Sequence, residues 1–186
     1  MGILLGLTLS GCISFGAEPP DQLLTLMPAQ TVAAGTSRTV APGDAITVLW
    51  PSIPADLNTT RVPVQATATS VAYVKNAQWS DTPNKIFARL LGETIEARTG
   101  HPVLSPRQFA LDPGTRVTGQ LERFGIDANP QQAVVVFDAV VARGTDIRTQ
   151  RFEARVPVAE IEAQAVGAAL NQAANQVAAE VADWLK

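Results

Sequence analysis

Cysteine and histidine are nearly absent from this sequence, which has one of each among its 186 residues. One cysteine cannot close an intramolecular disulfide or build a cysteine-based zinc site. One histidine lacks the second imidazole that such sites commonly use. The sequence therefore predicts no structural metal and no cofactor.

A basic surface is also missing, because 14 Lys and Arg residues stand against 17 Asp and Glu residues, a net charge of -3. Nucleic-acid-binding proteins need Lys and Arg to displace counterions from phosphates, so DNA and RNA are not expected partners. Hydrophobic residues make up 46% of the chain and charged residues 17%, a globular composition. The length suits one domain with a substantial core.

Motifs for enzymatic chemistry are missing as well. No GxGxxG or GxxxxGK[ST] phosphate loop can be read. His101 follows a predicted helix, between a glycine and a proline, and no nucleophile motif lies near it. Four aspartates on predicted loops and strand edges are too dispersed for a metal-ligand pattern: Asp112, Asp127, Asp138 and Asp146. These absences predict a binding or scaffolding protein and not an enzyme.

Asp138 is unusual because it lies inside an apolar run, residues 133–141. Strand alternation places it on the face opposite Phe137, most simply towards solvent. A buried pair with an arginine is the alternative.

The first residues of the chain lack an apolar run of the roughly 20 residues that span a bilayer. Residues 3–11 are a short apolar stretch that ends in small residues, as in a secretion signal. Residues 9–12, Leu-Ser-Gly-Cys, resemble a bacterial lipobox. The resemblance implies that residues 1–11 are a signal peptide and that the Cys12 thiol carries a lipid. The alternative is an ordinary first strand or helix with a buried free cysteine.

A lipid on Cys12 would anchor the protein, because each buried methylene contributes about 0.8 kcal/mol to membrane partitioning. Ile13 stands where lipoproteins kept in the inner membrane of enteric bacteria carry aspartate, so the resemblance implies an outer-membrane, periplasm-facing protein of a Gram-negative bacterium. Residues 12–21 are predicted to be the lipidated N-terminus and tether, and residues 22–186 the single domain. The eight residues 14–21 span at most about 28 Å, which keeps the domain near its membrane.

Strand-like patterns recur along the domain. They cover residues 22–27, 45–50, 62–69, 70–75, 116–126, 133–141 and 149–156. Short polar connectors join the last three, which predicts an antiparallel meander.

Two helices are expected. The first begins near Pro83 and ends at Gly100, and the second covers residues 158–186 and is rich in alanine. The order of elements predicts an α+β fold, a mixed and mainly antiparallel sheet with both helices on one face. The alanine-rich helix could pack within one subunit or between subunits, so a homo-oligomer stays open.

Residues 74–100 resemble the central signature of the ABC-type transport auxiliary lipoproteins, the family that includes paraquat-inducible protein C. In that family a strand leads into a Trp, then a small or acidic pair, then an amphipathic helix. Here these are Trp79, Ser80, Asp81 and the helix from Pro83. The lipobox, the segments "ITVLWPSIPADL" and "RFEARVPV", and the terminal helix ending in "ADWLK" extend the resemblance over the mature chain.

The resemblance implies a non-catalytic role in a mammalian-cell-entry (MCE) system, where an inner-membrane ABC transporter and MCE-domain proteins move phospholipids or other hydrophobic molecules between membranes. The lipoprotein would dock the assembly at the outer membrane or pass lipid to it. The alternative is a structural envelope lipoprotein that assists assembly of a pilus, a secretin or another outer-membrane machine. Trp79 is a candidate interface residue, because tryptophan is enriched at binding hot spots. A Trp before a helix is, however, more often a packing residue.

Overall fold

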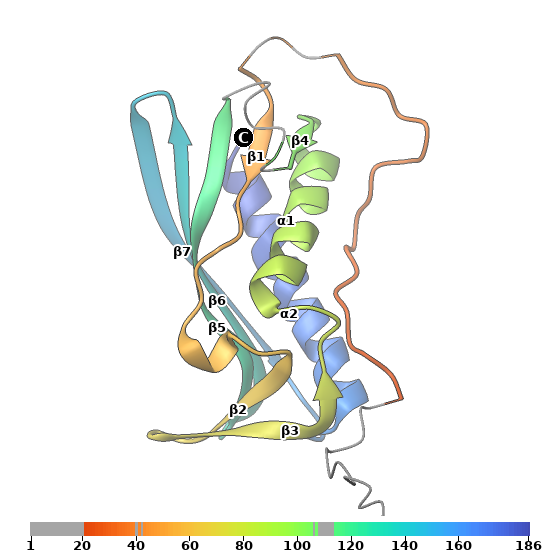
Figure 1. Cartoon of the computed structure of the whole chain (residues 1–186), viewed down its shortest axis with the longest axis vertical. Coiled ribbons are helices and arrows are strands. Elements are labelled where there is room, and N and C mark those ends of the chain that lie inside the picture. The colour runs from red at the N-terminus through yellow and green to blue at the C-terminus, as the bar shows by residue number, and fades with distance from the viewer. Residues whose placement is uncertain (1–20, 40, 42, 106, 108–113) are drawn as a thin grey trace, which may run out of the picture.

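The computed structural model describes residues 21–39, 41, 43–105, 107 and 114–186 (Figure 1). One sheet, two α-helices and a short 3-10 helix make up this part of the chain. In order they are β1 (Ile46–Val48), η1 (Ala55–Leu57), β2 (Arg61–Thr67), β3 (Ser70–Gln78), α1 (Pro83–Thr99), β4 (Val103–Leu104), β5 (Thr115–Ala128), β6 (Gln131–Arg143), β7 (Asp146–Pro157) and α2 (Ala163–Trp184).

The long central strand β5 organises the sheet. On one side it pairs antiparallel with β6, which pairs antiparallel with β7, so the predicted meander is confirmed. On the other side its first residues pair parallel with β1, and its last residues pair parallel with β2. β3 and β4 complete the sheet beyond β2 and β1. The predicted sheet, mixed and mainly antiparallel, is confirmed.

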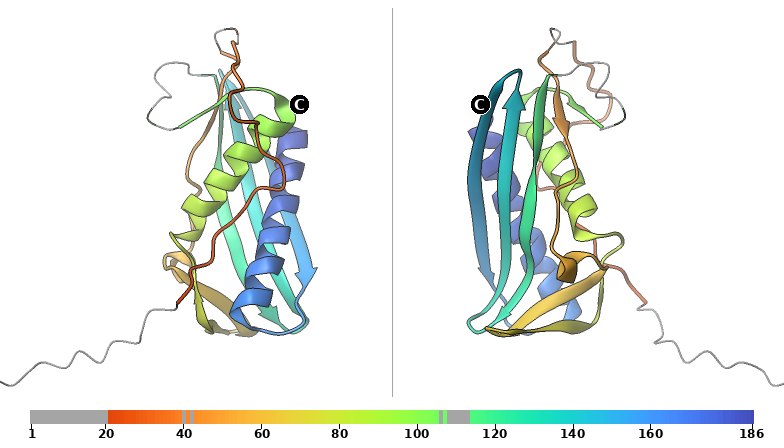
Figure 2. Two further views of the ribbon diagram at one scale, coloured as in Figure 1. Left: turned by 90° about the vertical axis from the view of Figure 1, so that its right-hand side faces the viewer. Right: turned by 60° about the vertical axis from the view of Figure 1, so that its left-hand side comes forward.

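Both helices cover the same face of the sheet, as predicted (Figure 2). α2 contacts β6 and β7, and α1 lies between α2 and the strands β1 and β4. The side of α2 that faces inwards is largely alanine, including Ala173, Ala174 and Ala178, all of them fully buried. These small side chains let α2 lie close to both the sheet and α1.

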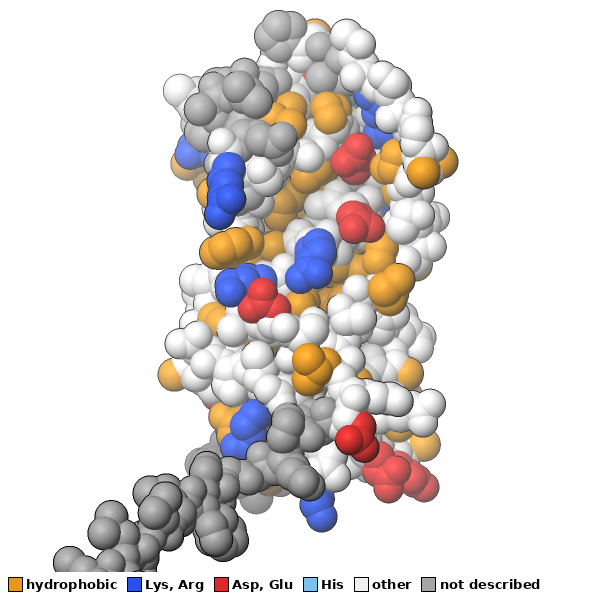
Figure 3. Space-filling model, turned by 45° about the vertical axis from the view of Figure 1, so that its right-hand side comes forward, with side chains coloured by type: hydrophobic (Ala, Val, Ile, Leu, Met, Phe, Trp, Pro, Cys, Tyr) orange, Lys and Arg blue, Asp and Glu red, His pale blue; other side chains and the backbone are white. Residues whose placement is uncertain are grey.

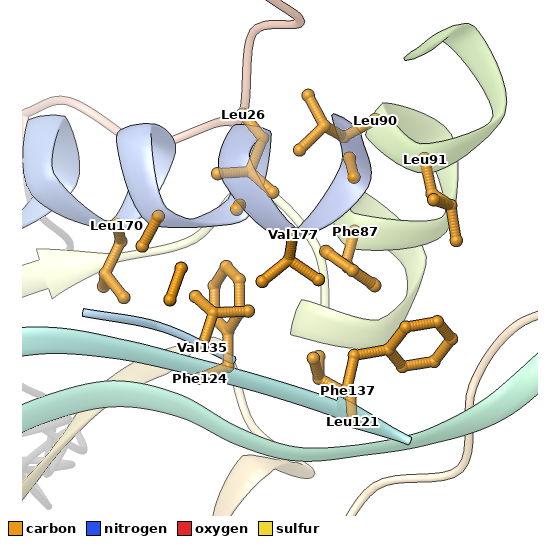
Figure 4. Close-up of a cluster of buried hydrophobic side chains, with 14 of the residues drawn as sticks. Leu26, Phe87, Leu90, Leu91, Leu121, Phe124, Val135, Phe137, Leu170 and Val177 are labelled. Atoms are coloured by element: carbon orange, nitrogen blue, oxygen red, sulfur yellow. The ribbon is translucent and has the colours of Figure 1, made fainter. Parts of the chain in front are cut away.

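The core lies between the helices and the sheet (Figure 4). Phe87 of α1 meets two sheet residues, with ring centroids 5.2 Å from Phe137 and 6.4 Å from Phe124. Trp79 extends this aromatic row, 5.3 Å from Phe124. Aromatic rings at these separations and tilts add to the free energy of burial. The row joins α1 to the end of β3 and to the middle of the sheet.

Two glycines of β5 permit close backbone contacts. Gly119 has φ +148°, and a Cβ there would lie 2.0 Å from the carbonyl oxygen of Asp138. A Cβ on Gly125 would lie 2.5 Å from the carbonyl oxygen of Pro63, where β2 meets β5. Any larger side chain at either position would force the neighbouring strand away.

Several predicted boundaries were wrong. Residues 22–27 do not form a strand in the sheet: only Leu24 makes a bridge, to Trp79, because the following backbone bonds to side chains of α2. α2 begins at Ala163, five residues later than predicted, after bends at residues 159–162. The strand at residues 45–50 is shorter, Ile46–Val48, and the two-residue strand β4 was not predicted.

Candidate functional site

Residues 22–30, which we term the N-terminal strap, fix the start of the domain to its core. The Leu24 N–H donates to the carbonyl oxygen of Gln78 at 2.7 Å, and the Ser80 N–H donates to the carbonyl oxygen of Leu24 at 2.8 Å. Leu26 points into the core and is 8% exposed. The strap is therefore bonded on both sides of Trp79 before it continues over the helices.

Two asparagines of α2 hold the next part of the strap. Asn171 Oδ1 accepts the N–H of Met27 at 2.8 Å, and Asn175 Oδ1 accepts the N–H of Ala29 at 2.7 Å. Asn175 Nδ2 also donates to the carbonyl oxygen of Met27 at 2.9 Å. These bonds satisfy strap backbone groups that have no strand partner. They explain why an apolar segment that resembles a strand in sequence runs instead along a helix.

The position of the strap distinguishes the two ends of the domain. Figures 1 and 2 place the start of the strap, drawn in red, at the end that holds the β2–β3 hairpin and the first turn of α2. β4, the last turn of α1 and the β6–β7 turn lie at the opposite end. The described chain therefore enters the domain at one defined end. Cys12, the predicted lipid attachment residue, lies outside the described residues.

Trp79, the candidate interface residue, lies in the core. It is 1% exposed, and its ring packs against Phe124. The indole Nε1 has no hydrogen-bond partner among the described residues. This burial leaves almost none of the ring for a partner to contact, which favours the packing interpretation.

The remaining polar candidates do not converge on a catalytic arrangement. His101 is exposed, and it lines a pocket of about 250 Å³ beside Asp44, Arg143 and Asp146. Asp44 is already paired with Arg143 at 3.3 Å. Across the residues that the structure describes, no three His, Cys, Asp or Glu side chains are grouped closely enough to hold a metal ion.

Asp138 faces solvent, as strand alternation predicts, and pairs with an arginine there. Arg151 Nε and Arg151 Nη2 donate to its two carboxylate oxygens at 2.6 and 2.5 Å. These hydrogen bonds from Arg151 lower the pKa of Asp138, and burial opposes them only in part. The side chains are 33% and 62% exposed, so this is a surface pair on neighbouring strands.

A groove between α1 and the strands β1 and β4, which we term the Trp50 groove, was not predicted from the sequence. One part encloses about 380 Å³, and an adjoining part of about 670 Å³ shares Trp50 and Ser105 with it. Its apolar floor comes from Val48, Ala88, Gly92, Val103 and Leu104. Figure 3 views this side, where apolar side chains lie in a hollow flanked by charged ones. Trp50 lies at the edge of this groove and is 60% exposed.

Charged side chains of α1, together with Asp81 just before it, line the helix side of the Trp50 groove. Lys85 Nζ lies 3.1 Å from Asp81 Oδ1 and 5.5 Å from the centre of the Trp50 ring. The pKa of Asp81 is lowered, first by the hydrogen bond from the Thr82 N–H and then by Lys85. Arg89, one turn further, makes no hydrogen bond or salt bridge with any described residue. Arg89 acts electrostatically on Asp81, and Glu93 on the next turn of α1 lines the same groove, so the groove carries charges of both signs.

The sequence contains one feature that indicates this groove. Trp50 lies two residues beyond the end of β1 and is followed by Pro51, which cannot donate to a strand partner. The sequence pattern predicts a strand over residues 45–50, with Trp50 as its last residue. The groove itself could not be inferred, because it needs β4, and this two-residue strand has no recognisable pattern.

Two solved structures share this fold. A crystal structure of an uncharacterised protein matches with a TM-score of 0.69 at 10% identity, covering 89% of this chain and all of that one. A DUF330-family protein from Xanthomonas campestris matches with a TM-score of 0.66 at 19% identity, covering 89% of this chain and 91% of that one. A PelC dodecamer from Paraburkholderia phytofirmans gives a TM-score of only 0.40 at 9% identity, covering 77% and 91%.

Sequence comparison identifies the family. A search of curated proteins found no match. No helix among the described residues combines the length and apolar character needed to cross a membrane. Residues 23–182 match the family described as "ABC-type transport auxiliary lipoprotein component", which spans the strap, the whole sheet and nearly all of α2. This chain therefore belongs to the ABC-type transport auxiliary lipoprotein component family.

Proposed function

We propose that this protein is the outer-membrane-anchored, non-catalytic docking component of an MCE-type lipid transport system. Family membership supports a role beside an ABC-type transporter. The observation that carries the docking role is the strap, which bonds the start of the domain to Gln78, Ser80 and α2 at one end of the fold. An anchored strap orients the domain, and an oriented domain can present a fixed surface.

Acyl chains on Cys12 supply the membrane attachment in this proposal. Nine residues lie between Cys12 and the strap, so the membrane-facing end lies within about 35 Å of the bilayer surface. α2, with its 22 residues, extends about 33 Å from this end, since a helix rises 1.5 Å per residue. The opposite end of the domain, with β4 and the last turn of α1, then points into the periplasm.

Docking fits the described surfaces better than carriage of lipid does. Ligand pockets commonly enclose most of the ligand surface within apolar walls. The pockets here are open to solvent and have charged residues in their walls, among them Arg89 and Glu93 in the Trp50 groove. Such a surface suits contact with a polypeptide that has both apolar and charged groups.

The experiment is affinity capture from native cell envelopes, with partners identified by mass spectrometry. The wild-type chain is compared with Cys12→Ala, which removes the lipid attachment and leaves the domain unchanged. We expect an MCE-domain protein and its ABC transporter with the wild type, and at least a tenfold loss with Cys12→Ala.

Two results would contradict the proposal. Recovery of secretin or pilus components in place of MCE proteins would favour the structural envelope lipoprotein. Equal recovery of MCE proteins with Cys12→Ala would show that docking does not depend on attachment of the protein to the membrane. The oligomeric state of the captured protein, measured by light scattering, tests whether a homo-oligomer forms.

A further inference from the structure

We propose that the free edge of β7 holds the transport assembly, by pairing with an extended polypeptide segment that adds one strand to the sheet. This inference rests on the proposed function and adds to it the docking surface and the form of the partner segment. Among the described residues β7 pairs only with β6, so the other side of its backbone has no strand partner.

The described sheet ends in β7, β3 and β4, and β7 is the edge suited to further pairing. β4 has only two residues. β3 leaves strand geometry at Asn76, where φ is +55°, and the strap bonds its last residues through Leu24. β7 has 12 residues that pair with β6 in one continuous register, and Figure 2 shows it along the outer border of the sheet. A long, regular edge of this kind is a template for another strand.

Alternate residues of β7 direct their backbone groups away from β6. The Val158 N–H, just after β7, donates to the carbonyl oxygen of Gln131 at 3.1 Å, so the even-numbered residues are the ones that bond to β6. Pro157 has no N–H and ends the outward series. The other odd-numbered residues turn both the N–H and the C=O outwards: Ile147, Thr149, Arg151, Glu153 and Arg155. Such a row of donors and acceptors is complementary to an extended main chain.

The side chains beside this edge define the second feature of the segment. On the face of the sheet opposite the helices, the charged side chains of β7 are already in ion pairs: Arg151 with Asp138, and Arg155 with Asp127 and Glu153. On the helix face, the partly buried Trp184 packs against Phe152, with ring centroids 5.6 Å apart, and Arg148 lies over the Trp184 ring. Main-chain bonds therefore supply the affinity, and uncharged, apolar side chains of the segment fit on the helix face beside Phe152 and Trp184.

A second copy of this chain does not fit this edge at the membrane. Two copies paired antiparallel through β7 would point in opposite directions along the long axis of the domain (Figure 1). Their starts would lie about 40 Å apart along that axis, because β7 has 12 residues and a strand rises about 3.3 Å per residue. The stretch from Cys12 to the strap spans about 35 Å at most. The occupant is therefore a segment of a different polypeptide.

The test is site-specific photocrosslinking in the full-length, membrane-anchored chain. Benzoylphenylalanine replaces Ile147, which is 69% exposed on β7. Trp50 beside α1 and Val71 on the β2–β3 hairpin are the control positions, because both are exposed and neither lies on β7. We expect a crosslink to an MCE-domain protein from position 147 that is about tenfold or more stronger than from position 50 or 71.

The outcomes separate this inference from the proposed function. If the MCE assembly co-isolates but its crosslinks arise from position 50 or 71, or from none of the three, the edge assignment is overturned and the docking function stands. A crosslink from position 147 to a second copy of this chain also overturns the assignment. If no MCE assembly co-isolates with the wild type, the proposed function fails, and the edge assignment fails with it.

A proline variant tests the main-chain bonds directly. Thr149→Pro removes one outward N–H and leaves the bonds to β6 in place, a position where edge strands tolerate proline. We expect capture of the assembly to fall about tenfold or more, because a hydrogen bond is lost and the ring obstructs the neighbouring strand. Thr149→Ala is the matched control, because it removes the side chain, keeps the N–H and should retain capture. Equal capture by both variants, with thermal unfolding showing that both are folded, would overturn the assignment. If Thr149→Pro does not fold, the crosslink from position 147 decides.

Discussion

Asn175 holds Met27 through the backbone: its Nδ2 donates to the Met27 carbonyl oxygen at 2.9 Å, and its Oδ1 accepts the next available N–H, that of Ala29, at 2.7 Å. The two residues are 148 positions apart in the chain. One amide side chain thus replaces a strand partner for the segment that precedes the sheet.

Removal of this side chain should loosen the strap. We expect Asn175→Ala to lower the free energy of unfolding by about 1 to 2 kcal/mol, because two hydrogen bonds to the strap are lost. Amide hydrogen exchange of residues 22–30 should accelerate more than exchange of β5. Gln176→Ala, an exposed neighbour on α2, is the control and should change neither quantity. Unchanged exchange in Asn175→Ala would show that the strap does not depend on Asn175.

Replacement of Gly119 should disrupt the middle of the sheet. A Cβ at this position would lie 2.0 Å from the carbonyl oxygen of Asp138, and φ of +148° disfavours any other residue. We expect Gly119→Ala to cost about 3 kcal/mol or more in chemical denaturation, a loss typical of strained core sites. Gly92→Ala is the control, because its Cβ would meet Val103 at an ordinary 3.4 Å. A loss below about 1 kcal/mol would contradict this reading of β5.

Variants of Trp79 distinguish packing from an interface. We expect Trp79→Ala to lower stability by about 3 to 5 kcal/mol, because a large buried ring is lost. Trp79→Phe should cost less and should leave capture of the assembly unchanged, since the aromatic contact with Phe124 can persist. Thermal unfolding measures the first effect and envelope capture the second. If the Trp79→Phe variant is stable but no longer captures the assembly, Trp79 is part of the interface and the packing interpretation is wrong.

Asp127 makes stability depend on pH in the acid range. Burial would raise the pKa of this carboxyl, but hydrogen bonds and charges from Arg123 and Arg155 outweigh burial and lower the pKa below 3.8. A carboxyl with a lowered pKa stabilises the fold above its unfolded-state pKa, and this contribution disappears as the pH falls through the folded-state value. Stability should therefore fall as the pH drops below about 4.

The check is urea denaturation at several pH values. We expect Asp127→Asn to cost about 1 to 2 kcal/mol at pH 7, because charged hydrogen bonds are weakened. The difference from the wild type should shrink as the pH approaches 2. Asp138→Asn removes an exposed pair with Arg151 and should have a smaller effect at pH 7. If the difference in unfolding free energy between the wild type and Asp127→Asn grows as the pH falls, the pKa of Asp127 is not lowered in the folded state.

The sequence predicted the elements whose side chains repeat with a clear period. In α1, Ile86 and Leu90 recur at a spacing of four, as one face of a helix requires, and both are buried, as is Ile95. The meander followed from alternation and short connectors, and Phe137 and Asp138 face opposite sides of β6 as alternation requires. Local chemistry was sufficient for these elements, because each carries its own signal over many residues.

Features that depend on distant partners were missed. Residues 22–27 alternate like a strand, but Asn171 and Asn175, nearly 150 residues later, determine where this segment lies. The Trp50 groove needs β4, which pairs with β1 over only two residues. No local pattern marks either feature, since both depend on contacts between segments that are far apart in the chain.

The most direct test is membrane fractionation of cells that express the wild type or Ile13→Asp. It measures in which membrane the protein and its partner are found. In the proposed function Cys12 carries the lipid, and an aspartate directly after it should retain the protein in the inner membrane and leave the domain intact. We predict that wild-type protein sediments with outer membranes and captures the MCE assembly there, and that Ile13→Asp moves to inner membranes and loses that outer-membrane contact. Wild-type protein in the inner membrane, or MCE proteins held at the outer membrane equally well after Ile13→Asp, would contradict the account.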